Sequence, residues 1–195
     1  MNTTSILFAG VGGQGIILAS RLLARCAFNA GFMVKESELH GMSQRGGSVT
    51  GHVRFGDEVY SPLIPAGKAD YMLAMEELEG LRCAFYLKPH GRVVLNKKSI
   101  VPSIINPLTA PYPKDVKDKL NGMNLDVDEL NAEEIAKNTG NPKVENIVLI
   151  GALSVYLPLA AAIWEETINE SFPPKFLEIN LAAFEKGRAV VAAKQ

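Results

Sequence analysis

The sequence predicts one α/β domain of three layers, α/β/α, built around a mainly parallel sheet. The first observation is a continuous apolar run at residues 5–9, which is typical of a strand buried on both faces. The second is the glycine-rich segment after it, which leads into a helix expected to end near Ala30. The third is the length of 195 residues, which favours a single domain over residues 1–195.

The first helix and the segment after it predict a Rossmann-like β-α-β unit. Ala19, Leu22 and Cys26 recur at helical spacing on one face, and Gly31 is placed to end the helix. Residues 32–34 are then expected to form a second strand, reached by a right-handed crossover.

An antiparallel hairpin is expected to interrupt this parallel pattern. Residues 36–51 are polar and rich in glycine and show no helical period. Residues 48–55 and 58–61 flank Gly56-Asp57, and the first of these stretches alternates apolar and polar side chains. We therefore expect the two stretches to pair as an inserted β-hairpin.

The rest of the chain alternates strand and helix patterns. Residues 102–113 hold four prolines, which predicts irregular structure. Residues 147–164 carry no charge, and because Pro158 divides them they predict a buried core helix rather than a membrane span. Strands are expected at residues 71–75, 92–95 and 124–127, a turn at 89–91, and helices at 76–87, 114–120, 132–138 and after Pro173.

The composition argues against nucleic acid and membranes as partners. With 20 basic and 21 acidic residues, the chain has no positive surplus to release counterions from DNA or RNA.

Cys26 and Cys83 belong to no Cys-x-x-Cys pair, so we expect buried free thiols in a reducing compartment. The first residues lack the features of a secretory signal, and a cytoplasmic location is expected.

The glycine-rich segment predicts an anion-binding site. Gly10, Gly12, Gly13 and Gly15 follow a buried strand and precede a helix. Glycine allows a tight turn and the close approach of a phosphate, and the helix start offers N–H groups and the positive end of its dipole. The alternative interpretation is a glycine-rich corner that binds nothing. A P-loop is excluded because no Gly-Lys-Ser/Thr follows.

The second loop, residues 36–49, carries groups that suit the same anion. Arg45, followed by Gly46 and Gly47, combines a bidentate donor with free backbone N–H groups. His40 could titrate near neutrality, or it could be a solvated surface side chain. Apolar residues in and near this loop could belong to a subunit interface or to the core: Leu39, Met42, Leu63 and Ile64.

Together the two loops resemble a known family. The segments GVGGQGI (residues 10–16) and HGMSQRGGSV (residues 40–49) are similar to the gamma-type subunit of the 2-oxoacid:ferredoxin oxidoreductases. The second segment is most like the small, or beta, subunit of the indolepyruvate branch. Residues 180–184 and Gly187 extend the resemblance over nearly the whole chain.

The resemblance implies a subunit of an oxidoreductase that is not active alone. Such complexes decarboxylate a 2-oxoacid, here an arylpyruvate such as indolepyruvate, on thiamine diphosphate, reduce ferredoxin through iron–sulfur clusters and release an acyl-coenzyme A. The chain has no cysteine run for a cluster and no Gly-Asp-Gly motif for magnesium and thiamine diphosphate, so these are expected only in a large partner subunit. This chain is expected to assist coenzyme A binding and assembly, and a homodimer could form when it is isolated.

The expected binding site comprises both loops, with no catalytic residue and no metal ligand. Two other functions stay open: a stand-alone NAD(P)- or flavin-binding oxidoreductase and a non-catalytic nucleotide-binding module. Glu36 or Glu38, about twenty residues beyond the turn, would suit the ribose of a dinucleotide, but the expected hairpin replaces the usual second β-α-β unit. The predicted site residues are Gly10, Gly12, Gly13, Gln14, Gly15, His40, Gln44, Arg45, Gly46, Gly47 and Ser48.

Overall fold

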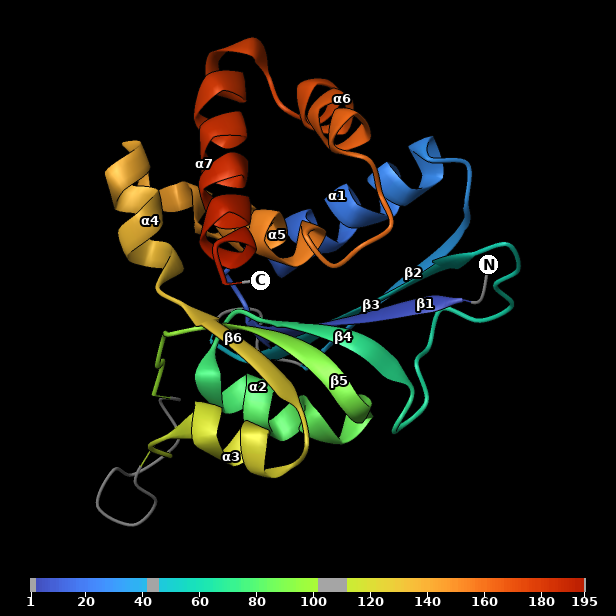
Figure 1. Ribbon diagram of the computed structural model, residues 1–195, viewed down its shortest axis with the longest axis vertical. Coiled ribbons are helices and arrows are strands. Elements are labelled where there is room, and N and C mark those ends of the chain that lie inside the picture. The colour runs from blue at the N-terminus through green and yellow to red at the C-terminus, as the bar shows by residue number, and fades with distance from the viewer. Residues whose placement is uncertain (1–2, 42–45, 102–111, 195) are drawn as a thin grey trace.

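The computed structural model describes residues 3–41, 46–101 and 112–194, and these form a six-stranded sheet (Figure 1). The strands are β1 (Thr4–Val11), β2 (Met33–His40), β3 (Ser48–Gly56), β4 (Ala69–Ala74), β5 (Leu87–Asn96) and β6 (Asp126–Leu130). Their order is β2-β3-β1-β4-β5-β6. β3 is antiparallel to both neighbours and the other pairs are parallel, so all strands except β3 point the same way. The prediction of a mainly parallel sheet is confirmed.

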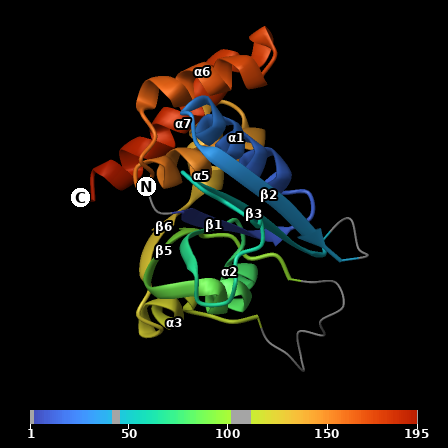
Figure 2. The same cartoon turned by 90° about the vertical axis from the view of Figure 1, so that its right-hand side faces the viewer.

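Helices cover both faces of the sheet and complete the three layers (Figure 1 and Figure 2). One face carries α1 (Ile16–Asn29), α4 (Ala132–Thr139), α5 (Glu145–Ser154), α6 (Ala161–Ser171) and α7 (Pro174–Ala192). The other face carries α2 (Glu77–Cys83) and α3 (Val116–Gly122). Short 3-10 turns at Ala84–Tyr86 and Pro142–Val144 precede β5 and α5. The predicted α/β/α architecture is confirmed.

Alternate side chains of β1 enter two separate cores. Ile6 and Phe8 belong to the cluster that includes α1 and α5, whereas Leu7 and Ala9 belong to the cluster with α2 and α3. All four side chains are fully buried. A strand covered on both faces needs apolar residues at every position, which explains the continuous apolar run in the sequence.

The N-terminal β-α-β unit is present, but it is split. β1, α1 and β2 follow one another as predicted, and β2 points in the same direction as β1. β3 lies between them and forms hydrogen bonds with both. The second strand of the unit is therefore the edge of the sheet rather than the neighbour of β1.

The hairpin predicted from residues 48–55 and 58–61 is wrong, because β3 pairs with the strand before it rather than with a strand after it. β3 pairs with β2, from Met33 opposite Gly56 to His40 opposite Val49, whereas residues 58–61 form no strand. Residues 36–40, expected in an irregular stretch, are part of β2. An edge strand can expose its side chains to water, so β2 contains polar residues such as Lys35. These residues show no apolar pattern that would have indicated a strand.

Later elements largely follow the prediction, with two corrections. β5 begins at Leu87, so the turn expected at residues 89–91 lies inside this strand, where His90 has a φ of 58°. The uncharged stretch forms two helices, α5 and α6, and Pro158 lies between them because proline lacks the N–H that a continuous helix requires. Residues 102–111 of the proline-rich segment lie outside the described residues. Among the described residues, no helix has the length and apolar character needed to cross a membrane.

Candidate functional site

The glycine-rich turn lies at the carboxyl end of β1, beside the parallel strand β4 (Figure 1). β1 leads into α1 on one face of the sheet, and β4 leads into α2 on the opposite face. The crevice outside such a pair of strands is where open α/β sheets bind ligands. Gly15 caps α1 with a φ of 78°, a conformation that glycine adopts without steric cost. The topology thus gives the predicted site a position suited to a ligand.

The side chain of Gln14 forms its contacts within the protein. Its Oε1 accepts a hydrogen bond from the Val11 N–H at 2.9 Å, and its Nε2 donates to the Met75 carbonyl at 2.8 Å. These bonds connect the turn to the end of β4. A Cβ on Gly10 would lie 2.7 Å from Gln14 Oε1, so glycine at position 10 makes room for this side chain. Gln14 therefore shapes the turn, and both polar ends of its side chain have partners.

The two predicted loops are joined by backbone hydrogen bonds. The Gly12 N–H donates to the Gly47 carbonyl at 2.9 Å, and the Gly46 N–H donates to the Gly12 carbonyl at 3.3 Å. Gln44 and Arg45 lie outside the described residues, but Arg45 directly precedes Gly46 in the chain. The structure therefore brings together the glycine parts of both motifs.

A cavity of about 500 Å³ opens beside these loops at the start of α1. Within the described part of the chain, the N–H groups of Gly13 and Gly15 have no hydrogen-bond partner, and the first N–H groups of any helix lack intrahelical acceptors. The first turn of α1 contains no acidic residue that would oppose the positive end of the helix dipole. Ile16, Ile17 and Val49 supply the apolar part of the cavity wall. The full set of lining residues is Gly12, Gly13, Gly15, Ile16, Ile17, His40 and Val49.

His40 ends β2 and is exposed at the rim of this cavity. Its Nδ1 lies 3.2 Å from the carbonyl oxygen of Gly41. A carbonyl oxygen can only accept, so Nδ1 carries the hydrogen in this contact and Nε2 is left to face a ligand or solvent. His40 thus lines the same cavity as Gly12, Gly13 and Gly15.

Ser48 is attached to the opposite layer of the protein. Its Oγ lies 2.6 Å from Oε2 of Glu79, a buried residue of α2. A carboxylate only accepts hydrogen bonds, so the Ser48 hydroxyl directs its proton at Glu79. That proton is not directed at the glycine turn, and the contact with Glu79 holds the loop.

Two residues that the sequence analysis did not single out support the turn. Asn146 of α5 donates from Nδ2 to the Gly15 carbonyl at 3.3 Å, and a Cβ on Gly15 would lie 2.5 Å from that nitrogen. Asn146 is a buried polar residue at the start of an apolar helix, a position that could have drawn attention to it. Glu79 follows Glu76 and Glu77 in the chain, and nothing in the sequence distinguishes it from them.

Comparison with known proteins decides between the possible families. A family model described as pyruvate ferredoxin/flavodoxin oxidoreductase matches residues 5–190. The chain belongs to this family. The indolepyruvate oxidoreductase subunit IorB of Pyrococcus horikoshii is 43% identical over 100% of this chain and 98% of its own length. The Archaeoglobus fulgidus protein of the same name is 41% identical over 94% of this chain and 92% of its own length.

Solved structures of two ferredoxin oxidoreductases share the fold. The gamma subunit of the keto/oxoacid ferredoxin oxidoreductase of Geobacter sulfurreducens has 25% identity and a TM-score of 0.74, with 97% of this chain and 99% of that chain covered. The 2-oxoglutarate:ferredoxin oxidoreductase of Magnetococcus marinus has 22% identity and a TM-score of 0.75, with 99% of this chain but 32% of that chain covered. The prediction of a gamma-type small subunit of a 2-oxoacid:ferredoxin oxidoreductase is confirmed.

The two cysteines of this oxidoreductase subunit lie in different cores. Cys26 belongs to the cluster with α1, and Cys83 belongs to the cluster on the opposite face of the sheet. Burial raises the pKa of the Cys26 thiol to about 12 and that of the Cys83 thiol to about 11. Both thiols are therefore protonated at neutral pH, whereas a metal ligand must be a thiolate. Across residues 3–41, 46–101 and 112–194, no three His, Cys, Asp or Glu side chains come together as a metal site.

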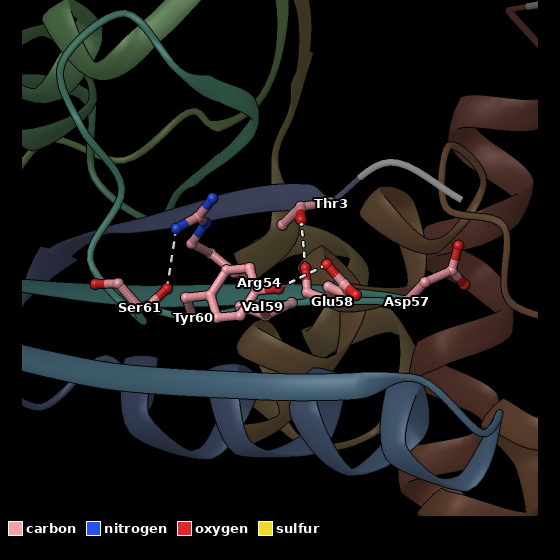
Figure 3. A pocket seen from close by; sticks show the side chains of 7 residues that line it. All are labelled: Thr3, Arg54, Asp57, Glu58, Val59, Tyr60 and Ser61. Carbon is pink, nitrogen blue, oxygen red and sulfur yellow. Dashed lines mark hydrogen bonds between the residues drawn. The ribbon is translucent and has the colours of Figure 1, made fainter.

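A separate hollow of about 600 Å³ lies at the far end of β3 (Figure 3). The Arg54 guanidinium there donates to the Ser61 carbonyl at 2.9 Å and to Ser5 Oγ at 3.1 Å, so it holds the connection that leads to β4. Asp57 and Glu58 also line this hollow, and their negative charge disfavours an anion. The glycine turn is therefore the better candidate for an anion-binding site. The wall consists of Thr3, Arg54, Asp57, Glu58, Val59, Tyr60 and Ser61.

Of the apolar residues expected at an interface or in the core, one is buried and two are exposed. Ile64 is buried in the core, whereas Leu39 and Leu63 are 46% and 49% exposed. Met42 lies outside the described residues. Leu39 directly precedes His40 in β2, but it is not among the residues that line the cavity.

Proposed function

We propose that this chain binds coenzyme A for a large partner subunit that oxidises arylpyruvates, with indolepyruvate as the first candidate. In the proposed complex, thiamine diphosphate in the partner supports decarboxylation, and iron–sulfur clusters carry the electrons to ferredoxin. The acyl group passes to the thiol of coenzyme A. This chain supplies no catalytic residue; it holds the coenzyme, directs its thiol and assembles with the partner.

The pairing of the two loops at the start of α1 carries this proposal. The hydrogen bonds between Gly12, Gly46 and Gly47 put free glycine amides and the segment after Arg45 side by side. Amides at a helix start favour phosphate, and a guanidinium adds a charge-assisted, bidentate contact. A ligand with several phosphate groups can use both kinds of donor at once.

The cavity beside the turn supports a ligand that is charged at one end and uncharged along its length. Ile16, Ile17 and Val49 form its apolar wall beside the glycine amides. The phosphates of coenzyme A suit the amides, and its long uncharged chain suits the apolar wall. Holding the thiol in a fixed direction makes acyl transfer effectively unimolecular, which lowers the entropic part of the barrier.

The names of related proteins support the same substrates. Four relatives at 35% to 43% identity are named indolepyruvate oxidoreductase subunit IorB. The Magnetococcus marinus enzyme, which shares the fold, was solved with 2-oxoglutarate, coenzyme A and succinyl-CoA bound. An arylpyruvate and coenzyme A are therefore the first pair to test.

A stand-alone NAD(P)- or flavin-binding oxidoreductase fits the geometry less well. A dinucleotide fold puts its ribose-binding carboxylate at the end of the strand next to β1. Here β3 occupies that place, and Glu38 lies one strand further away with its Oε1 3.7 Å from Nε of Arg21.

The third candidate, a non-catalytic nucleotide-binding module, predicts that the partner stays active when this chain is removed.

The test is the coenzyme A dependence of the complex co-expressed with its large subunit. Arg45→Ala is expected to remove a charge-assisted contact worth roughly 1.5–3 kcal/mol, which raises the KM for coenzyme A about ten- to hundredfold. Arg25→Ala is the matched control, because Arg25 lies on the exposed side of α1 and pairs with Glu170 at 3.0 Å.

Three results would separate the candidates. An unchanged KM for coenzyme A in Arg45→Ala, with assembly intact, would reject the coenzyme role of this loop. Tight binding of NAD(P) or flavin to the isolated chain would favour the second function. Retention of a thiamine- and iron-containing large subunit by the tagged chain, followed by activity that requires both subunits, supports the first function. Assays with indolepyruvate, phenylpyruvate and pyruvate then establish the preferred 2-oxoacid.

A further inference from the structure

We infer that Glu79 is a positioning residue that fixes the second loop against the glycine turn. The inference about loop geometry is independent of the ligand, and its consequence for coenzyme A rests on the proposed function. Glu79 is 3% exposed and belongs to α2, on the face of the sheet opposite to α1. It does not line the cavity beside the turn, so it acts through other residues.

The carboxylate of Glu79 joins α2 to the start of β3. Oε2 accepts a hydrogen bond from Ser48 Oγ at 2.6 Å, and Oε1 accepts one from Arg82 Nη1 at 2.9 Å. The backbone of Glu79 is fixed as well, because its N–H donates to the buried carboxylate of Glu76 at 2.8 Å. Both carboxylate oxygens and the backbone N–H of Glu79 thus form hydrogen bonds.

From Ser48 the connection continues directly to the glycine turn. Ser48 follows Gly47, whose carbonyl accepts from the Gly12 N–H at 2.9 Å. Ser48 is also the register partner of Val11, the last residue of β1. The position of the Ser48 side chain therefore determines where Gly46 and Gly47 meet Gly12, and Glu79 holds that side chain.

The burial of a charge explains why this contact is specific. A buried carboxylate is costly unless an opposite charge and hydrogen bonds compensate it, and an apolar residue would fill the same space without that cost. Arg82 compensates the charge from outside, since its side chain is 60% exposed and that of Glu79 is 4% exposed. Contacts made by a buried polar group can specify a single arrangement, which here is the position of Ser48.

The first test measures the loop contact itself in the full-length chain. Water-exchange NMR follows the amide protons of Gly12 and Gly46, which bond across the two loops. Ser48→Ala is the main variant, because Ser48 is exposed and its replacement leaves the core intact. We expect exchange of both amides to accelerate about tenfold, since local opening becomes easier when the loop loses its attachment.

Substitutions of two glutamates on the same helix supply the comparison. Glu79→Gln keeps an acceptor for Ser48 but loses the charge, so exchange is expected to lie between that of the wild type and that of Ser48→Ala. Glu77→Gln is the matched control, because Glu77 accepts from Ser99 and has no contact with Ser48. Combining Glu79→Gln with Ser48→Ala is expected to add little to Ser48→Ala alone, as for two residues that act through one contact.

The second test uses the complex with its large subunit. Ser48→Ala is expected to raise the KM for coenzyme A about tenfold with little change in kcat, because a displaced loop weakens binding before chemistry. Unchanged exchange at Gly12 and Gly46 in Ser48→Ala overturns the positioning role. Faster exchange with an unchanged KM supports the positioning role and counts against the coenzyme A function. If Glu79→Gln fails to fold, Ser48→Ala alone decides between these results.

Discussion

Gly187 of α7 packs so closely on Val148 of α5 that a Cβ at position 187 would lie 1.9 Å from the Val148 carbonyl oxygen. The contact is reciprocal, since a Cβ on Gly151 of α5 would lie 2.1 Å from the Phe184 carbonyl oxygen. Both clashes involve backbone, which cannot rotate away as a side chain can. The two glycines therefore set the distance at which these helices cross.

The first prediction is that Gly187→Ala destabilises the protein by about 3 kcal/mol, because the helices must separate to admit a methyl group. Urea denaturation followed by circular dichroism measures this loss. Gly122→Ala is the control, because Gly122 ends α3 with nothing within 4 Å of an added Cβ. This second change is expected to be neutral or to stabilise by up to about 1 kcal/mol. Equal effects at both positions would contradict the interpretation.

The second prediction concerns Gly15 and Asn146 at the start of α1. Gly15→Ala combines a φ of 78° with a Cβ only 2.5 Å from Asn146 Nδ2, so a loss of about 2 kcal/mol is expected. Asn146→Ala removes the obstructing atoms. The double variant should therefore lose less stability than the two single variants together, by about 1 kcal/mol, in a thermodynamic cycle from urea denaturation. Simple additivity would show that the clash does not determine the cost.

The place of the glycine turn between β1 and α1 could be predicted from the sequence, but the residues that support it could not. The glycine turn is visible in the sequence itself, as four glycines within six residues that follow an apolar run and precede a helical pattern. Asn146 reaches Gly15 from 131 residues away, and Glu79 reaches Ser48 from 31 residues away on the other face of the sheet. Such contacts arise only after the layers have assembled, so no local pattern indicates them.

The same distinction holds for the strands. β1 was predictable because burial on both faces leaves an uninterrupted apolar run, as at Leu7 and Phe8. β2 continues to His40, beyond its predicted end at residue 34. Its full length could not be predicted, because an edge strand tolerates polar residues such as Glu36 and so lacks an apolar pattern. The partners of β3 could not be read locally, since its pairing with β1 joins residues as distant as Thr4 and Phe55.

The third prediction is that the native protein protects both thiols from alkylation. Burial raises the pKa of Cys26 to about 12 and that of Cys83 to about 11, so at about pH 8 almost no thiolate is present to react. Iodoacetamide followed by mass spectrometry should show no adduct in the folded chain and two adducts after unfolding in urea. Rapid labelling of the folded chain at either residue would mean that its core is more open than described.

The last prediction is a loss of stability at mildly acidic pH that depends on His52. This residue of β3 is 1% exposed; its Nδ1 accepts from the Ile64 N–H at 3.2 Å, and among the described residues its Nε2 has no partner. Burial lowers its pKa below the ordinary value of about 6.5. Below about pH 6.5 the unfolded chain therefore binds a proton that the folded chain does not. Stability is then complete above that pH and is lost as pH falls toward the folded pKa, by up to about 1.4 kcal/mol per pH unit.

Urea denaturation between about pH 7.5 and about pH 5 measures this slope. His52→Gln is expected to flatten it, even if absolute stability falls, because the side chain no longer titrates. His90→Asn is the matched control, since His90 is exposed and asparagine tolerates its φ of 58°. The control should keep the wild-type slope. An unchanged slope in His52→Gln would assign the acid sensitivity to groups other than His52.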